Sequence, residues 1–350
     1  MNKLLTLSLL GMLLLSCSAS AAWDRLWDQR VDAVVVKHGI SIENSGQPYP
    51  TGDIPADNIR LFATSNRTGD IYRYNGTPDR WTKVGNPGKK FAATGGVESR
   101  LYGLDPAGMG VYEFKGTPME WTQVGGPAAD IYAGGTKLYA TNPEDDWEIY
   151  EYTGTPWEWV QIGELAPSRQ SMGPIVDYAA AGGGYLVGMG FPYERSPSEL
   201  YLLAERYTSE GVAVGVVLKY TGTPLDWKML PAGDLDFSAV YGRGFNPGTI
   251  YARDYHSRDI YRWSEDDEIW EKASDPAKTF IADQRIEDSS VHNLLYRLKA
   301  DGELWMYDDS VGSWTEIETG GFRNPLKEIH AAGGELYGVT EADYIYKYVP

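Results

Sequence analysis

The chain has 350 residues with 31 basic and 49 acidic side chains, so its formal net charge is −18. This charge excludes proteins that bind nucleic acid through its phosphates, because such binding needs cationic side chains to displace counterions. It disfavours binding to anionic membrane surfaces for the same reason. The 12 Trp, 25 Tyr, 40 Gly and 20 Pro are typical of short aromatic strands joined by tight turns, so we expect an all-β fold.

The N-terminal segment, residues 1–21, has the pattern of a secretory signal peptide: a basic Lys3, an apolar run and small residues before Ala22. Two processing routes are open. Cleavage after Ala21 would release a secreted or periplasmic protein, whereas residues 14–17 resemble a bacterial lipobox that would leave an outer-membrane lipid anchor on Cys17. No later apolar stretch reaches the roughly 20 residues that a transmembrane helix needs. We therefore expect an exported protein without a transmembrane segment.

A strand motif rich in large and aromatic residues then recurs seven times. Its copies are Ile71–Tyr74, Val111–Phe114, Ile149–Tyr152, Val217–Tyr220, Ile260–Trp263, Leu304–Tyr307 and Ile345–Tyr348. A Trp stands ten residues after the start of each of the first six copies, at Trp81, Trp121, Trp159, Trp227, Trp270 and Trp314. In four copies a Gly-Thr-Pro turn separates the motif from the Trp, which predicts a hairpin. At a fixed strand position these Trp residues are expected to pack in the core.

Two further strands precede each hairpin, so each unit has four strands and a period near 40 residues, the pattern of propeller blades. We predict a single β-propeller domain over residues 23–350 with seven four-stranded blades and an insertion in blade four around residues 190–216. The last unit stops at Pro350 without its Trp strand. An N-terminal strand is expected to complete this blade and close the ring, which would also remove exposed sheet edges.

The repeats resemble those of the tachylectin and tectonin group of propellers. The likeness is clearest in residues 121–128, which read WTQVGGPA, and in residues 149–156, which read IYEYTGTP. Members of this group are lectins and related recognition proteins, and many bind amino sugars or bacterial envelope glycans. The resemblance therefore implies an exported, carbohydrate-binding propeller with sites repeated around the ring, and with glycans or polysaccharides as partners.

Candidate ligand residues lie in the loops between the second and third strands, where Asp and Asn could pair with hydroxyl groups, and among Trp residues outside the repeat. They are Asn66, Asp105, Asn142, Trp147, Trp157, Asp254 and His256. Asp, Asn and Gly are also ordinary turn formers, so these loops have a purely structural explanation as well. The spacing of His, Cys and acidic residues predicts no metal site, and no cofactor motif is visible.

Two alternatives to glycan binding remain open. Tyr255, His256 and Arg258 would suit proton abstraction in a propeller polysaccharide lyase or hydrolase with a single site near His256. Against this, the negative net charge would repel an anionic polymer. The third possibility is a scaffold for protein interactions at the cell envelope. A propeller fold supports each of these functions equally.

Overall fold

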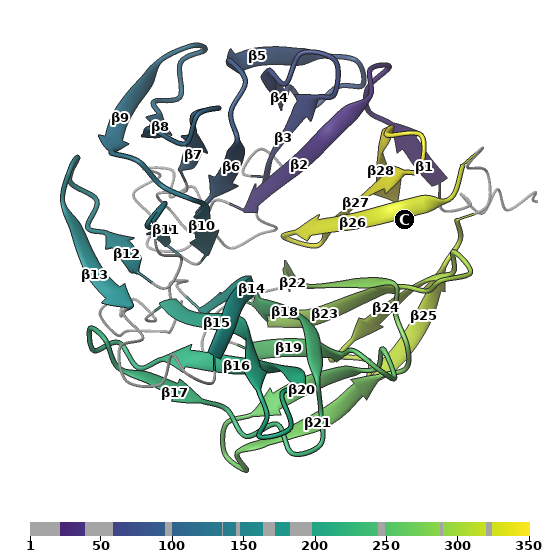
Figure 1. The fold of residues 1–350 in the computed structure, drawn as a ribbon. Coiled ribbons are helices and arrows are strands. Elements are labelled where there is room, and N and C mark those ends of the chain that lie inside the picture. Colours follow the sequence, from purple (N-terminus) through teal and green to yellow (C-terminus); the bar gives the residue numbers. More distant parts are fainter. Residues whose placement is uncertain are drawn as a thin grey trace, which may run out of the picture.

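The computed structural model describes residues 22–38, 59–94, 100–134, 136–144, 148–163, 172–182, 198–243, 249–287, 290–319 and 324–350. Within these ranges every regular element is a β-strand, and the strands form seven four-stranded antiparallel sheets around a central axis (Figure 1). The predicted all-β fold with seven blades is therefore confirmed. The predicted leader, residues 1–21 with Cys17, lies outside the described residues.

The first three blades contain the clearest repeats. Blade 1 consists of β2 (Val31–His38), β3 (Ile59–Ser65), β4 (Ile71–Tyr74) and β5 (Trp81–Gly85); blade 2 of β6 (Lys90–Ala93), β7 (Leu101–Leu104), β8 (Val111–Phe114) and β9 (Trp121–Gly125); and blade 3 of β10 (Ile131–Gly134), β11 (Lys137–Thr141), β12 (Ile149–Tyr152) and β13 (Trp159–Gly163).

The next three blades repeat the same order, and their first two strands are longer than those of blades 2 and 3. Blade 4 consists of β14 (Met172–Gly182), β15 (Ser198–Tyr207), β16 (Ala213–Tyr220) and β17 (Trp227–Met229); blade 5 of β18 (Phe237–Arg243), β19 (Thr249–Asp254), β20 (Ile260–Ser264) and β21 (Ile269–Ser274); and blade 6 of β22 (Thr279–Glu287), β23 (Ser290–Leu298), β24 (Leu304–Asp308) and β25 (Ser313–Ile317).

Blade 7 joins the two ends of the chain. It contains β26 (Leu326–Ala332), β27 (Glu335–Thr340), β28 (Ile345–Val349) and, as its fourth strand, the N-terminal β1 (Ala22–Arg25). Strand β1 pairs antiparallel with β28, with Trp23 opposite Tyr348. Neighbouring first strands contact one another around the axis, including β2 and β26 across the closure (Figure 1). The predicted closure by the N- and C-terminal strands is thus present.

The hydrophobic core lies between the blades. Among the described residues the buried side chains fall into clusters, each shared by two neighbouring blades. The closing interface, for example, buries Leu26 and Trp27 of the N-terminal segment against Tyr337 and Val339 of blade 7 and Leu61 of blade 1. Because each sheet buries both of its faces in this way, the ring distributes its apolar burial over all of its interfaces.

The repeated Trp residues connect neighbouring blades rather than filling a single centre. The indole N–H of Trp121 donates to the carbonyl of Val84 in blade 1 at 2.8 Å, and that of Trp159 donates to Val124 in blade 2 at 2.9 Å. The same carbonyls accept a second hydrogen bond, from the backbone N–H of Met119 and Trp157 respectively. Each Gly-Thr-Pro turn thereby holds its blade against the preceding one.

The range predicted as an insertion, residues 190–216, contains all of β15 and the start of β16 where the structure describes it. These strands have 10 and 8 residues, whereas the corresponding strands β7 and β8 have 4 each. Within the described residues, the second and third strands of blade 4 are thus longer than their counterparts in blade 2. Across the described ranges, no helix has the length and apolar character needed to cross a membrane.

Candidate functional site

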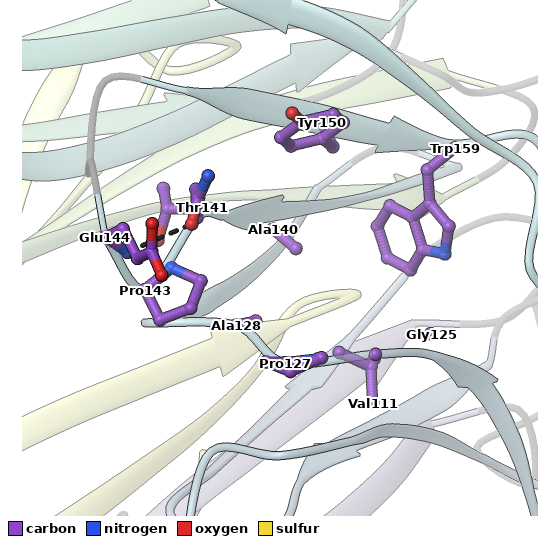
Figure 2. A pocket seen from close by; sticks show the side chains of 12 residues that line it. Val111, Gly125, Pro127, Ala128, Ala140, Thr141, Pro143, Glu144, Tyr150 and Trp159 are labelled. Atoms are coloured by element: carbon purple, nitrogen blue, oxygen red, sulfur yellow. Dashed lines mark hydrogen bonds between the residues drawn. The ribbon is translucent and has the colours of Figure 1, made fainter.

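An open cleft lies between blades 2 and 3. It has a volume of ≈ 490 Å³ and is lined by the end of β9, the following link, parts of β11 to β13 and the loop after β11. Figure 2 shows Trp159, Tyr150, Pro143 and Pro127 around this space. One aromatic wall and a concave shape are what small-molecule and sugar sites commonly provide.

The position of Trp159 follows from its hydrogen bond and from its neighbours. Its ring lies 5.1 Å from that of Tyr152, the residue opposite it on β12. Its indole N–H donates a hydrogen bond to the carbonyl oxygen of Val124. A Cβ atom on Gly125 would come within 3.0 Å of the indole, so the absence of a side chain at Gly125 is what lets the ring lie against blade 2. Trp159 is only half-buried, and it lines the cleft.

Polar groups stand at the rim of the cleft. The side-chain oxygen of Asn142 accepts the backbone N–H of Glu144 at 3.0 Å, and its amide nitrogen donates to Glu148. The Tyr150 hydroxyl also donates to Glu148, at 3.4 Å. These contacts fix Asn142 and Tyr150 beside the exposed Glu144. The rim therefore offers a carboxylate and an amide, whereas the wall offers aromatic rings.

The corresponding space at the closing interface is occupied by the chain itself. The carbonyl of Leu26 accepts the Trp81 indole as that of Val124 accepts Trp159, so Trp27 takes the place of Gly125. Trp27 stacks on Trp81 with ring centroids 4.7 Å apart and 18° between the planes, and it also makes an edge contact with the ring of Tyr72. The same architecture thus forms a filled interface with Trp27 and a cleft with Gly125.

Three of the predicted ligand residues accept hydrogen bonds within their own turns. The Asp105 carboxylate accepts the backbone N–H groups of Ala107 and Met109, and Asn142 acts in the same way towards Glu144. Asp254 is buried and accepts both the N–H and the hydroxyl of Ser257. Of these three residues, Asn142 also lines the cleft.

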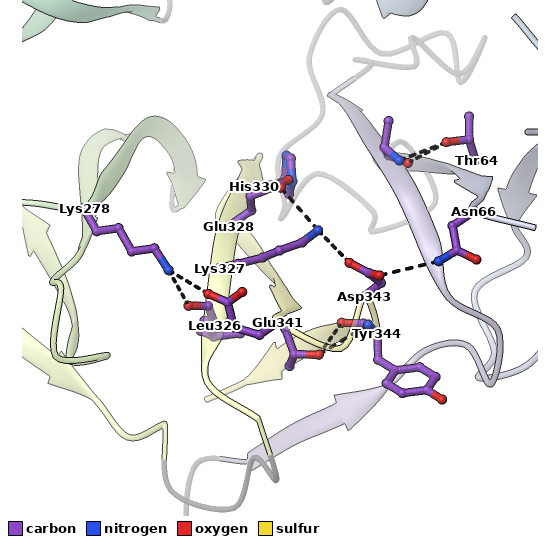
Figure 3. Close-up of polar contacts among 12 residues, drawn as sticks. Thr64, Asn66, Lys278, Leu326, Lys327, Glu328, His330, Glu341, Asp343 and Tyr344 are labelled. Carbon is purple, nitrogen blue, oxygen red and sulfur yellow. Dashed lines mark hydrogen bonds and ion pairs between the residues drawn. The ribbon is translucent and has the colours of Figure 1, made fainter.

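Asn66 belongs to a polar network at the junction of blades 7 and 1. Its amide donates to Asp343 at 3.5 Å, and Asp343 in turn accepts Lys327 at 2.7 Å (Figure 3). The ion pair with Asp343 raises the pKa of Lys327 above its ordinary value. These contacts join loops across the closure, so Asn66 has a structural role here and lies apart from the cleft.

The two predicted Trp ligands are placed differently. Trp147 lies outside the described residues. Trp157 is 61% exposed and has a positive φ of 71° at the hairpin turn of blade 3, the same turn position as Asp79, Met119 and Leu225. Its backbone N–H bonds to blade 2, while its indole is among the exposed large apolar side chains and does not line the cleft.

Tyr255, His256 and Arg258 lie on the loop of blade 5 that follows β19. The His256 side chain is 73% exposed and its Nε2 lies 3.4 Å from the Asp236 carboxylate. The Tyr255 side chain is also exposed, and its ring lies 5.3 Å from that of His256. The three side chains are thus close in sequence and displayed on the surface. Among the described His, Cys, Asp and Glu residues, no group of three or more is placed to hold a metal ion.

Comparisons with known proteins show the fold and no family. No family model and no curated protein sequence matches the chain. Among solved structures, a catalytically inactive variant of virginiamycin B lyase from Staphylococcus aureus, crystallised with quinupristin, is 11% identical with a TM-score of 0.53; the match covers 95% of this chain and 99% of that one. YCF48 from Cyanidioschyzon merolae is 12% identical with a TM-score of 0.53, covering 94% and 99% respectively. At these identities the likeness concerns the propeller alone.

Sequence reasoning missed most of the cleft because it assigned Trp159 to the core with the other repeated Trp residues. A usable signal was the link after the outer strand. It reads Gly125-Gly126-Pro127-Ala128 before blade 3 and Ser274-Asp275-Pro276-Ala277 before blade 6. Two consecutive glycines at this position remove the side chains that would otherwise fill the space beside the Trp.

Proposed function

We propose that the protein binds glycans through the cleft between blades 2 and 3, as an exported propeller lectin of the tachylectin and tectonin kind. The observation that carries this proposal is the cleft itself, in which the aromatic wall of Trp159 and Tyr150 faces the polar rim of Asn142 and Glu144. The apolar face of a sugar ring packs on aromatic side chains, while its hydroxyl groups pair with amide and carboxylate groups at the rim.

The proposal favours fewer sites than the repeat alone would suggest. At the closing interface Trp27 occupies the equivalent space. At the interface of blades 1 and 2, the ring of Phe91 lies 6.1 Å from that of Trp121. We therefore expect fewer binding sites than blades. The leader and Cys17 fit export with or without a lipid anchor, which is a further part of the proposal.

The experiment is a titration of the chain with a panel of neutral, cationic and anionic oligosaccharides by calorimetry, with product analysis on the same samples. A Cβ added at Gly126 would meet no atom within 4 Å, so Gly126→Phe should place a ring at the mouth of the cleft without straining the link. We expect this variant to lose at least tenfold in affinity for any bound saccharide.

Asn86 supplies the matched control, because it occupies the position of Gly126 in the link between blades 1 and 2 and is exposed. Asn86→Phe should bind as the unchanged protein does. If Gly126→Phe binds a saccharide as tightly as the unchanged protein does, the ligand lies outside the cleft. If no oligosaccharide of the panel binds, the proposal of glycan binding is wrong. Formation of unsaturated or newly reducing products, lost in His256→Ala, would establish the enzyme instead.

A further inference from the structure

The interface of blades 5 and 6 shows what the chain itself places beside a repeated Trp. Arg297 is buried there, with 7% exposure, and its guanidinium carbon lies 4.4 Å from the ring centroid of Trp314 and 5.7 Å from that of Trp305. Its Nη1 donates to the Ser274 hydroxyl at 2.8 Å and lies 3.7 Å from the Asp275 carboxylate. A flat cation is therefore held between aromatic rings and an acidic link.

The cleft between blades 2 and 3 is built at the equivalent positions. Ala140 pairs with Tyr150 as Arg297 pairs with Trp305, and Trp159 pairs with Tyr152 as Trp314 pairs with Tyr307. In the preceding blade, Gly125 lies opposite Val111 as Ser274 lies opposite Ile260. The cleft thus keeps the aromatic rings and lacks the cation and its hydroxyl partner.

The charge of the cleft is of the sign that a cation requires. Glu144 is the one charged residue among the 12 that line it. A cation over an aromatic face is attracted by the negative charge of the ring face, and more strongly when it is desolvated. The formal net charge of −18 also raises the local concentration of cationic ligands.

We infer that the cleft takes a saccharide that carries an ammonium or guanidinium group, which occupies the place that Arg297 fills between blades 5 and 6. This inference rests on the proposed glycan binding and adds the chemical class of the ligand. One cationic group lies over the ring face of Trp159, and the saccharide extends along Pro127 and Pro143 to the opposite rim, where Glu144 pairs with a further cationic group. Anionic sugars are excluded by Glu144.

The test compares two oligosaccharides with one backbone: a β-1,4-linked glucosamine hexamer and its fully N-acetylated counterpart, titrated at pH 6. We expect the amine form to bind at least tenfold more tightly than the acetylated form, because only the amine form carries positive charge. Raising the salt concentration should weaken its binding, since a partly exposed ion pair is screened. Ala140→Arg, which imitates blade 6, should abolish binding.

Glu144→Gln should remove the preference for the amine, whereas Glu120→Gln, which removes an exposed acid that does not line the cleft, should leave it unchanged. Equal or tighter binding of the acetylated hexamer would overturn the inference and leave the proposed function standing. Methylguanidinium provides the third probe. If methylguanidinium alone binds, and Gly126→Phe abolishes its binding, the cleft recognises a cation but the proposal of glycan binding is wrong. If none of the probes binds, both proposals are wrong.

Discussion

The side chain of Asp254 illustrates how single residues fix the loops of this propeller. Burial raises the pKa of its carboxyl group, but hydrogen bonds from the backbone of Ser257 and Asp236 and from the Ser257 hydroxyl outweigh that effect, so the pKa lies below its ordinary value. The sequence marked this residue as a candidate ligand because a carboxylate in a loop suits both a sugar and a turn. The contacts of the carboxylate with its own loop support the role in the turn.

Asp254→Ala should lower the free energy of unfolding at pH 7 by about 1.5–3 kcal/mol, the range for hydrogen bonds to a charged group. Because the folded pKa is depressed, this contribution is present above the unfolded pKa of about 4 and is lost as the pH falls through the folded value. Urea unfolding at pH 7 and pH 3 should therefore show a smaller difference at pH 3. Asp301→Ala, at an exposed turn acid that accepts one backbone N–H, is the control and should cost under about 0.5 kcal/mol. A pH-independent difference would contradict the assigned role.

At the scale of the element, the hairpin of the third and fourth strands was predictable from the Gly-Thr-Pro turn and the constant ten-residue offset of the Trp. Its contact with the preceding blade was not. The carbonyl of Val84 accepts both the Trp121 indole and the Met119 amide, and neither partner is near it in sequence. A sequence repeat reports the strands within a blade, whereas the rotation between blades decides which groups meet across the interface.

The turn requires Gly116 in a left-handed conformation, with a φ of 93°. Gly116→Ala should therefore lower the free energy of unfolding by about 1–2 kcal/mol through backbone strain, although a Cβ there would meet no atom within 4 Å. Gly126→Ala is the control, because a Cβ at Gly126 also meets no atom within 4 Å but the residue does not have a positive φ. This variant should change the free energy of unfolding by under about 0.5 kcal/mol. Chemical denaturation of both variants makes the comparison. Equal effects would show that the conformation of this turn is not what stabilises the hairpin.

At the scale of the whole molecule, the ring and its closure followed from the repeat because a Trp strand is missing at the C-terminus and present at the N-terminus. The cleft did not follow, because it depends on a few side chains at equivalent positions: Trp27 or Gly125 at the link, and Arg297 or Ala140 on the second strand. The two residues at each of these equivalent positions differ in side-chain volume, but both are compatible with the same arrangement of strands. The fold is thus a property of the repeat, whereas the candidate site arises where the repeat loses its side chains.

The closure itself can be tested by joining the two ends of the chain covalently. Ala22 lies opposite Val349 in the β1–β28 pair, and both residues are exposed. Directly opposed strand residues have Cα atoms about 4.5–5.5 Å apart, within the range that a disulfide spans. A chain with Ala22→Cys and Val349→Cys, and with Cys17→Ser to prevent mispairing, should oxidise readily and gain about 2–4 kcal/mol of stability over its own reduced form. The gain is expected because unpairing of β1 exposes the edge of blade 7 and the Trp27 interface together, so a bond that holds β1 in place opposes opening of the whole ring.

Thermal unfolding of the oxidised and reduced protein measures this gain in stability, with the Ala22→Cys, Cys17→Ser variant as the control. Failure of the two cysteines to pair would contradict the register of β1 on β28, whereas pairing without added stability would show that the ring opens at another interface first.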